Sequence, residues 1–306
     1  MTRPAGAVLP VARLAEGLRR IDGRGYKAYR DVEGSYAGDG FVLHLDHAQG
    51  DPFAPPSRVR ITVAPATAAL PGEALAGKVR RVDVADYLLR RLRAAVAAAG
   101  RDRHRGMGKS GLVAVARPGQ EGLERTAVVV RPDGSVEARL GVGLPARGRT
   151  VLGREAEELL CSLLPALVRQ ALASAAREAE ELRCWWQVAE DQAWLRERLA
   201  GMGLVAFVAD GSVLPRESGA SDRPLRGPGV VPFRAPEGRL AVTVHLPHAG
   251  PVRGLGVPAG ITLITGGGYH GKSTLLRALE RGVYDHVPGD GREGVVTVAG
   301  AVKIRA

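Results

Sequence analysis

Apolar residues recur along this chain at two periods, and each period predicts a different kind of element. Apolar side chains three or four positions apart indicate helices with one buried face, whereas strict alternation or a short apolar run between glycines indicates strands. The segment RPDGS at 131–135 has the composition of a tight hairpin turn. The expected helices cover residues 11–20, 84–99, 154–183 and 187–199, and the expected strands cover residues 41–47, 57–63, 203–211, 239–246 and 260–266.

The helix at 84–99 has the clearest ends. Asp83 is placed to cap its start and Gly100 to end it. The order of the expected elements predicts an α+β domain in residues 1–150 and a second, α/β domain in residues 151–306. A polar, proline-containing loop at 212–233 interrupts the second domain and is long enough to have a function.

The stretch GGGYHGKST in the second domain has the spacing G-x-x-x-x-G-K-[ST] of a phosphate-binding loop. An apolar run, 261–265, precedes it as a buried strand, and a helix is expected to start immediately after it. Backbone N–H groups and the helix N-terminus then surround a β-phosphate, Lys272 bridges the β- and γ-phosphates, and the Ser273 hydroxyl binds Mg²⁺. The alternative is a glycine-rich turn that binds nothing. The predicted nucleotide-binding residues are Gly266, Gly267, Gly268, Tyr269, His270, Gly271, Lys272, Ser273 and Thr274, with Lys272 also catalytic.

Positive charge is concentrated in the first half of the chain. The net charge is +11, and residues 1–150 hold 25 Lys and Arg against 15 Asp and Glu. Such an excess favours a polyanionic partner, RNA or DNA. The loop at 100–111 contains GKS but lacks the first glycine of a phosphate loop, so it is not expected to bind a nucleotide. If it has a function, it is a basic clamp for nucleic-acid phosphates. The alternative is a charged loop that is only solvated. The clamp residues are Arg101, Arg103, Arg105 and Lys109.

Other candidates for chemistry are weaker. Tyr26 and Tyr29 could stack on bases, although tyrosines beside a turn are more often packed. The two cysteines, Cys161 and Cys184, accompany no CxxC or His/Cys cluster and are expected to be reduced thiols. No apolar run reaches 18 residues, so no membrane partner is expected and a cytoplasmic protein is predicted. Acid–base or metal chemistry has only isolated candidates, which are Asp46, His47, Asp51, His245 and His248.

Several ordered blocks resemble one known family, the predicted ATPases of the ABC class, which includes a mitochondrial RNA-editing-associated ATPase. The blocks include IDGRGYKAYRD, LDHAQGDPFAPPSRVR, GLVAFVADGSVLPRESGASDRPL and GGGYHGKSTLLRALERGVYDHVPGDGREGVVT. The resemblance implies an N-terminal domain followed by an ABC-type nucleotide-binding domain that binds ATP and Mg²⁺. It also implies a homodimer with nucleotide between its subunits, and an RNA role by analogy with the best-known relative.

The family's remaining catalytic parts have no match after Lys272. ABC-type hydrolysis requires an acidic strand end, an adjacent glutamate and a signature helix, and the acidic pair Glu190–Asp191 is expected in a helix instead. The sequence therefore predicts the N-terminal part of such an ATPase, truncated after the Walker A helix and hydrolysing ATP poorly. One alternative is a nucleic-acid-binding module with an idle phosphate loop. Another is a small-molecule kinase, but the position of the phosphate loop at residue 266 argues against a kinase.

Overall fold

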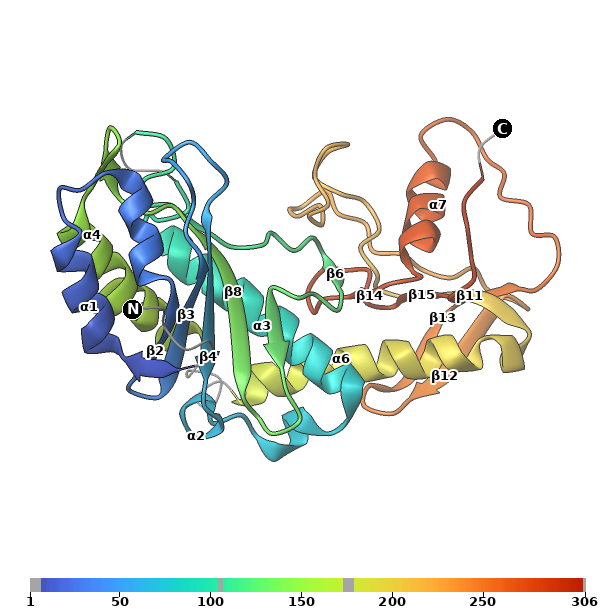
Figure 1. The fold of residues 1–306 in the computed structure, drawn as a ribbon. Coiled ribbons are helices and arrows are strands. Elements are labelled where there is room, and N and C mark those ends of the chain that lie inside the picture. Colours follow the sequence, from blue (N-terminus) through green and yellow to red (C-terminus); the bar gives the residue numbers. More distant parts are fainter. Residues whose placement is uncertain (1–6, 104–106, 173–178, 305–306) are drawn as a thin grey trace. The chain divides into compact units, whose positions relative to one another are not determined.

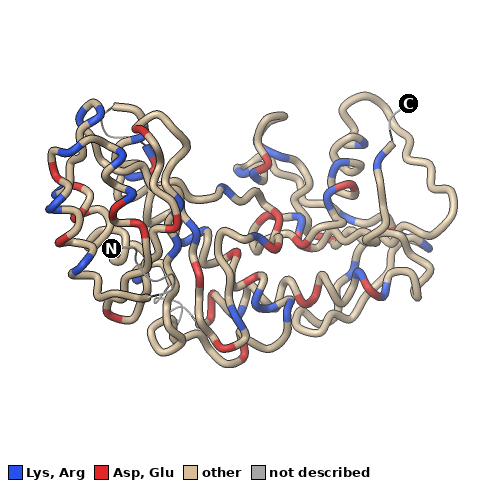
Figure 2. The backbone as a smooth tube through the Cα atoms, in the orientation of Figure 1, with Lys and Arg blue, Asp and Glu red and all other residues tan. Residues whose placement is uncertain are grey.

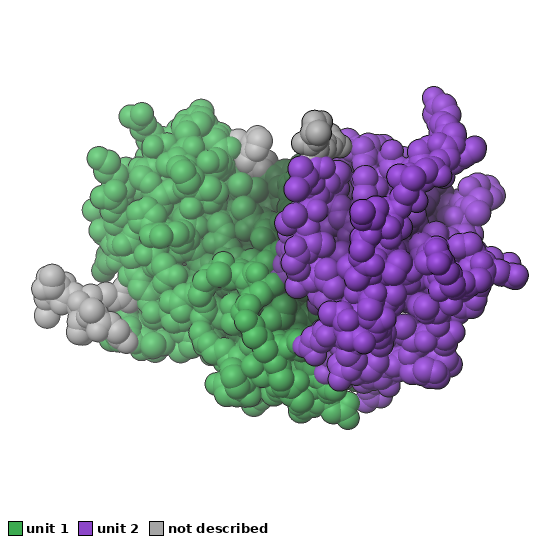
Figure 3. All heavy atoms as spheres, turned by 90° about the vertical axis from the view of Figure 1, so that its right-hand side faces the viewer, with its two compact units in different colours: residues 1–117, 124–182 green, residues 118–123, 183–306 purple. Residues whose placement is uncertain are grey.

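The computed structural model describes residues 7–103, 107–172 and 179–304 of the 306-residue chain. The chain forms two compact units of mixed helix and sheet (Figure 3). Unit 1 contains residues 1–117 and 124–182, and unit 2 contains residues 118–123 and 183–306. The short segment 118–123 thus leaves the first half of the sequence to join the second unit, where its strand β6 (Glu121–Gly122) pairs with β14 (Asp285–His286).

Unit 1 is built around one sheet, shown in blue and green in Figure 1. Its strands run in the order β1-β2-β3-β4-β8-β5, and β7 also pairs with β8. All these pairs are antiparallel except β1 with β2. The strands are β1 (Val8–Pro10), β2 (Gly34–Gly38), β3 (Phe41–His47), β4 (Ser57–Val63), β5 (Val113–Ala114), β7 (Val128–Val130) and β8 (Val136–Val142), with a separate pair, β9 (Ala146–Arg147) and β10 (Thr150–Val151).

Helices and short helical turns complete unit 1. Helix α1 packs against α4, and α3 packs against α5 and β7. The elements are α1 (Val11–Arg20), the 3₁₀ turns η1 (Tyr26–Val32) and η2 (Gly72–Leu75), α2 (Pro65–Ala68), α3 (Gly77–Ala98), α4 (Gly153–Glu157), the π-helical segment η3 (Glu158–Leu163) and α5 (Leu164–Leu172).

The alternating pattern confirms the predicted strands β3 and β4. Leu43 and Leu45 on β3, and Val59 and Ile61 on β4, are almost completely buried, whereas the residues between them are more exposed. The hairpin at RPDGS is also confirmed, because β7 and β8 pair across it and Gly134 adopts a φ of 85°. A positive φ is the conformation that glycine tolerates best, so this residue type fits the turn.

Two predicted helix boundaries are wrong. Helix α3 begins at Gly77 rather than at residue 84, so Asp83 lies inside the helix, buried, and does not cap it. The sequence from 77 to 83 is rich in charge and carries little apolar periodicity, which hid this first part of the helix. Residues 184–186 were expected to separate two helices, but α6 (Ala179–Arg198) runs through them and buries Trp186.

Unit 2 is a three-layer arrangement. Its sheet has the order β12-β13-β11-β15 with every neighbour antiparallel, and it comprises β11 (Leu204–Ala209), β12 (Ala241–Leu246), β13 (Gly250–Pro258) and β15 (Val295–Thr297). A 3₁₀ turn, η4 (Ala200–Met202), connects α6 to β11, and Gly203 follows it with a φ of 71°, a conformation that suits glycine. The predicted strands around 203–211 and 239–246 are confirmed as β11 and β12.

The central strand β11 alternates its side chains between the two faces of the sheet. Phe207 packs with Leu195 of α6 and with Leu199, the residue after that helix. Val208 packs on the other face with Ala278 of helix α7 (Lys272–Arg281). Each face therefore buries an apolar layer of its own, and α7 is held against the sheet by its own apolar side.

Candidate functional site

The glycine-rich loop at 266–274 leads directly into α7. Gly271 is the residue before the helix and has a φ of 76°, and Gly266 has a φ of 146°. The helix begins at Lys272, so the N–H groups of Lys272, Ser273 and Thr274 belong to its first turn and have no acceptor within the helix. These N–H groups and the positive end of the helix dipole favour an anion at this point.

Lys272 turns back over the loop that precedes it. Its Nζ donates to the carbonyl oxygen of Gly266 at 2.6 Å and to that of Gly267. The loop is further held by His270, whose Nδ1 accepts a hydrogen bond of 3.0 Å from the N–H of Gly267. The ammonium group is therefore positioned over the loop, and no carboxylate of the described residues forms an ion pair with it.

Tyr269 stands at the tip of the loop in a strained conformation. Its φ is 62°, which is uncommon for a residue with a side chain, and its ring is fully exposed. Such outliers concentrate at ligand sites. Around it the loop is open to solvent, because Ser273 and all the residues from Gly266 to Gly271 are exposed and only Lys272 and Thr274 are partly covered.

The predicted buried strand at 261–265 is wrong. These residues are in no strand, and the side chains of Ile261 and Leu263 are exposed. A β-strand needs a neighbour to accept its backbone hydrogen bonds. Among the described residues, the sheet of unit 2 ends at β12 on one edge and β15 on the other, and neither strand pairs with 261–265. The apolar composition predicted a buried strand, but the described part of the unit provides no strand that pairs with it.

The residues of the predicted basic clamp differ in their environment. Arg103 is exposed and Arg101 is half-buried, whereas Arg105 lies outside the described residues. Lys109 donates from Nζ to the carbonyl oxygen of Ala54 at 3.0 Å and is half-buried. This lysine therefore anchors its own loop to the neighbouring turn.

The other isolated candidates have structural partners. Tyr26 and Tyr29 are buried, contact each other edge to face, and donate from their hydroxyl groups to backbone carbonyls, so the packed interpretation is the right one. Burial raises the pKa of the Cys161 thiol to about 12, which disfavours a nucleophilic thiolate. Among the described residues, His, Cys, Asp and Glu form no group of three or more that could hold a metal ion.

Asp46 and His248 illustrate how the remaining acidic and histidine side chains are used. Asp46 accepts two hydrogen bonds of 3.1 Å from Arg60. Nε2 of His248 lies 2.7 Å from Glu190 on α6, whose position in a helix is as predicted. These pairs tie neighbouring elements together.

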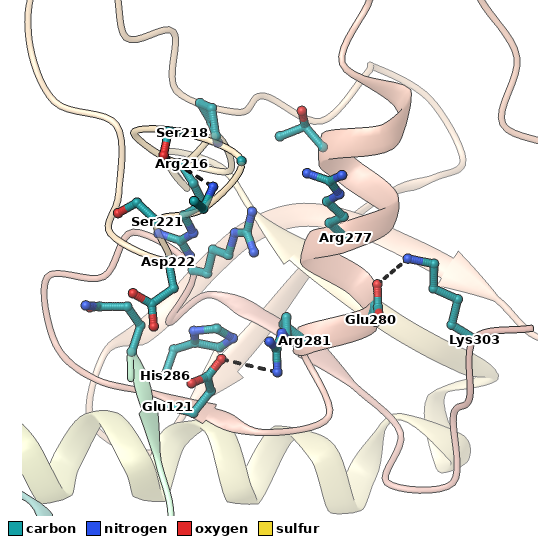
Figure 4. A pocket seen from close by; sticks show the side chains of 16 residues that line it. Glu121, Arg216, Ser218, Ser221, Asp222, Arg277, Glu280, Arg281, His286 and Lys303 are labelled. Atoms are coloured by element: carbon teal, nitrogen blue, oxygen red, sulfur yellow. Dashed lines mark hydrogen bonds and ion pairs between the residues drawn. The ribbon is translucent and has the colours of Figure 1, made fainter. Parts of the chain in front are cut away.

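A cavity beside α7 was missed by the sequence analysis. It has a volume of about 620 Å³ and lies wholly within unit 2, between the loop at 215–222 and the outer side of α7 (Figure 4). Thr274, the last residue of the glycine-rich loop, lines it. The only hint of this cavity in the sequence was the long polar loop at 212–233. The serines and arginines of that loop have no spacing that indicates a particular chemistry.

Comparisons with known proteins match both parts of the chain. A family model described as the N-terminal part of an ATPase of the ABC class matches residues 11–175, and a model described as the P-loop domain of an ABC ATPase matches residues 178–306. An uncharacterized protein of Methanocaldococcus jannaschii is 38% identical over 112 residues. That alignment covers 35% of this chain and 25% of the relative, so the chain spans about a quarter of the relative's length. Within the described residues, no helix is long and apolar enough to cross a bilayer.

Proposed function

The chain belongs to the ATPases of the ABC class, and we propose that its glycine-rich loop binds ATP with Mg²⁺. A P-loop domain implies nucleotide binding in general. The observation that carries the specific proposal is the position of Lys272, whose ammonium group rests on the carbonyl oxygens of Gly266 and Gly267 directly before a helix N-terminus.

The loop is open along part of its length. A Cβ added at Gly268 or Gly271 would meet no atom within 4 Å, whereas one added at Gly267 would meet the His270 ring at 3.0 Å. Lys272 then exchanges its two carbonyl partners for phosphate oxygens, a change that replaces neutral acceptors with charged ones. The exposed hydroxyl of Ser273 is the group that would hold Mg²⁺, an ion that prefers oxygen ligands and keeps several waters.

We further propose that the whole protein hydrolyses ATP and that these 306 residues alone do so slowly. The support is the openness of the loop, because efficient phosphoryl transfer requires positioned groups around the γ-phosphate and exclusion of bulk water. Here the loop from Gly266 to Gly271 is exposed to solvent throughout. A homodimer that closes nucleotide between two subunits is the expected active form for the family.

Nucleotide turnover by the whole protein tests this function. The wild type is compared with Lys272→Ala at saturating Mg²⁺–ATP, and the variant is expected to lose most of the rate. Equal rates in the two proteins would contradict the proposal. Gel filtration with and without ATP, before and after the same substitution, reports whether nucleotide brings two copies together.

A second candidate function is nucleic-acid binding, with RNA favoured, and with the phosphate loop either coupled to it or idle. The support is the excess of 25 Lys and Arg over 15 Asp and Glu in residues 1–150. Figure 2 shows these charges interspersed with acidic ones along unit 1, so the attraction is spread over the surface of the unit.

Free thiols at Cys161 and Cys184 favour a reducing compartment such as the cytoplasm.

Filter binding of single-stranded RNA and of DNA across a salt series tests this candidate. Binding that depends on phosphate contacts weakens steadily as salt rises. Neutralising Arg101, Arg103 and Lys109 together should make the affinity depend less steeply on salt. If ATP changes the affinity for nucleic acid, the phosphate loop is coupled to binding; if ATP has no effect, the loop is idle. A binding curve that does not respond to salt would contradict the candidate.

A further inference from the structure

The cavity beside α7 has two walls, and side chains of different elements meet across it. Arg277 projects from α7 on one side, and Ser218 and Ser221 belong to the loop on the other side (Figure 4). His286 of β14, which is buried, and Arg281 of α7, which is exposed, also line the cavity. Only Thr274 is shared with the glycine-rich loop, so the cavity is a separate feature of unit 2.

The loop that forms one wall is ordered by pairing within itself. Arg216 and Pro224 form an antiparallel bridge, and the N–H of Glu217 donates to the carbonyl oxygen of Arg223 at 3.0 Å. The hydroxyl of Ser221 donates to the Glu217 carboxylate at 3.0 Å. These contacts close residues 216–224 into a hairpin that presents its serines to the cavity.

Buried charged groups fasten this hairpin to the rest of the unit. Arg216 donates to the Asp290 carboxylate at 2.8 Å and to the Asp290 carbonyl oxygen at 2.9 Å, and Asp290 is completely buried. Arg292, 5% exposed, donates from Nε to the carbonyl oxygen of Leu214 at 2.9 Å. A wall held by buried arginines is rigid, and rigidity reduces the entropy lost on binding a ligand.

Two donor groups at the cavity are not used by the protein. His286 is 3% exposed, and its Nε2 has no hydrogen-bond partner among the described residues. Its Nδ1 lies 2.8 Å from the Asp290 carboxylate and likewise has no hydrogen-bond partner among the described residues. Arg277 is exposed, and within the described part of the chain it makes no ion pair or hydrogen bond. A buried polar atom without a partner is uncommon and calls for an explanation.

The charge balance at the cavity favours an anion. Burial and the nearby charge of Arg216 lower the pKa of the Arg292 guanidinium to about 10. Burial is the largest cause of this shift and the charge of Arg216 adds to it, so a bound anion would favour the charged form of Arg292. Of the basic side chains that line the cavity, Arg216 pairs with Asp290, Arg281 with Glu121 and Lys303 with Glu280. Arg277 and Arg292 remain, against the one further carboxylate of the lining, Asp222.

We propose that this cavity is a second anion site, separate from the glycine-rich loop, which binds the phosphate monoester of a phosphorylated ligand. A phosphate monoester is a compact dianion with three acceptor oxygens, and guanidinium, imidazole and hydroxyl groups are its usual donors. The lining has no Phe, Tyr or Trp on which a base could stack. The rest of the ligand therefore extends out of the cavity, and the phosphate is the part that is recognised.

Isothermal titration calorimetry at low salt tests the site with three probes. Ribose 5-phosphate represents a small phosphorylated molecule, a 5′-phosphorylated tetranucleotide represents a nucleic-acid end, and the same tetranucleotide with a 5′-hydroxyl group is the negative control. All three are titrated into the full chain carrying Lys272→Ala, which weakens the glycine-rich loop. We expect at least one phosphorylated probe to bind at least tenfold more tightly than the hydroxyl control.

Arg277→Gln is the decisive variant. The residue is exposed and makes no contact that the fold needs, and its loss removes one charge-assisted hydrogen bond, so the affinity should fall about tenfold. Arg239→Gln, which changes an exposed arginine outside the cavity, should leave the affinity unchanged within about twofold and is the matched control. Thermal unfolding checks that both variants fold.

The outcomes separate this inference from the proposed ATPase function. Binding of both phosphorylated probes, or of either one alone, supports the site and identifies the source of the phosphate. Three results overturn it: no binding of either phosphorylated probe, binding that is present in the wild type but absent with Lys272→Ala, or equal effects of Arg277→Gln and Arg239→Gln. Failure of ATP to bind the wild type contradicts the proposed function and leaves the result for this cavity unaffected.

Discussion

Replacing Lys272 by alanine separates a ligand-binding role from a structural one. In the structure Nζ of Lys272 donates to two carbonyl oxygens of an exposed loop, and neither acceptor is a buried group that needs this partner. Water replaces the ammonium group at these exposed carbonyl oxygens, so its removal leaves no buried acceptor unsatisfied and most of the two bonds' contribution is regained from solvent. The free energy of unfolding of unit 2 should therefore fall by less than about 1 kcal/mol.

The effect on nucleotide affinity should be much larger. A hydrogen bond to a charged acceptor contributes about 1.5–3 kcal/mol, so loss of the ammonium group from the β- and γ-phosphates should raise the dissociation constant of Mg²⁺–ATP about 10- to 150-fold. Calorimetric titration of Mg²⁺–ATP measures this change, and thermal unfolding in the absence of nucleotide measures the change in stability.

Lys78→Ala is the matched control for this experiment. Lys78 is an exposed lysine of unit 1 that forms a surface ion pair of 2.7 Å with Glu124, so its removal should alter neither nucleotide affinity nor stability appreciably. If Lys272→Ala leaves the dissociation constant within twofold of the wild type while the protein remains folded, the glycine-rich loop does not bind the phosphates as proposed.

Three further substitutions test the physical basis of the fold. Gly271→Ala places a side chain at a φ of 76° and should lower the free energy of unfolding by about 1–2 kcal/mol, whereas Gly268→Ala has no positive φ to strain and should change it little; denaturant titration compares the two. Phe207→Ala, at a position 1% exposed, should cost about 3–5 kcal/mol in the same titration, and Val231→Ala, at a position 81% exposed, should cost almost nothing. The pKa of the Glu137 carboxyl is lower than its ordinary value. Burial acts to raise this pKa, but three neighbouring arginines lower it by more. The stability that this carboxylate contributes is complete above about pH 4.5 and is lost as the pH falls through the lower folded-state pKa, so Glu137→Gln should flatten the decrease of melting temperature in acid, and an unchanged acid profile would contradict this assignment.

Local patterns predicted the elements whose burial is decided by their own neighbours in sequence. The alternation in β3 and β4 identified the buried face correctly because each strand packs one side against the core of unit 1. The helix α7 was predicted from the residues that follow the glycines, and its amphipathic pattern is explained by the packing of Ala278 on Val208. In these cases the apolar residues of an element lie on the face that is buried, so the sequence pattern is sufficient to predict the element.

Predictions failed where the environment came from distant residues. The run at 261–265 has the composition of a buried strand, yet in the described part of the chain no strand pairs with it and its side chains are exposed. Asp83 was expected to cap α3, yet it lies buried inside the helix, whose first residues from Gly77 to Val82 are exposed or partly exposed and show no apolar periodicity. Propensity and periodicity do not report contacts with distant residues.

By itself the sequence determined the identity of the glycine-rich loop, because its spacing and its following helix are local properties of the chain. Tertiary structure alone decided that the short segment at 118–123 joins unit 2 and that the cavity beside α7 exists. Arg216, Arg277 and His286 are up to 70 residues apart in the sequence, and only the packing of a loop, a helix and a short strand brings them together. The physical reason is that a site made by long-range packing has no spacing of its own, whereas a phosphate loop is made by consecutive backbone groups.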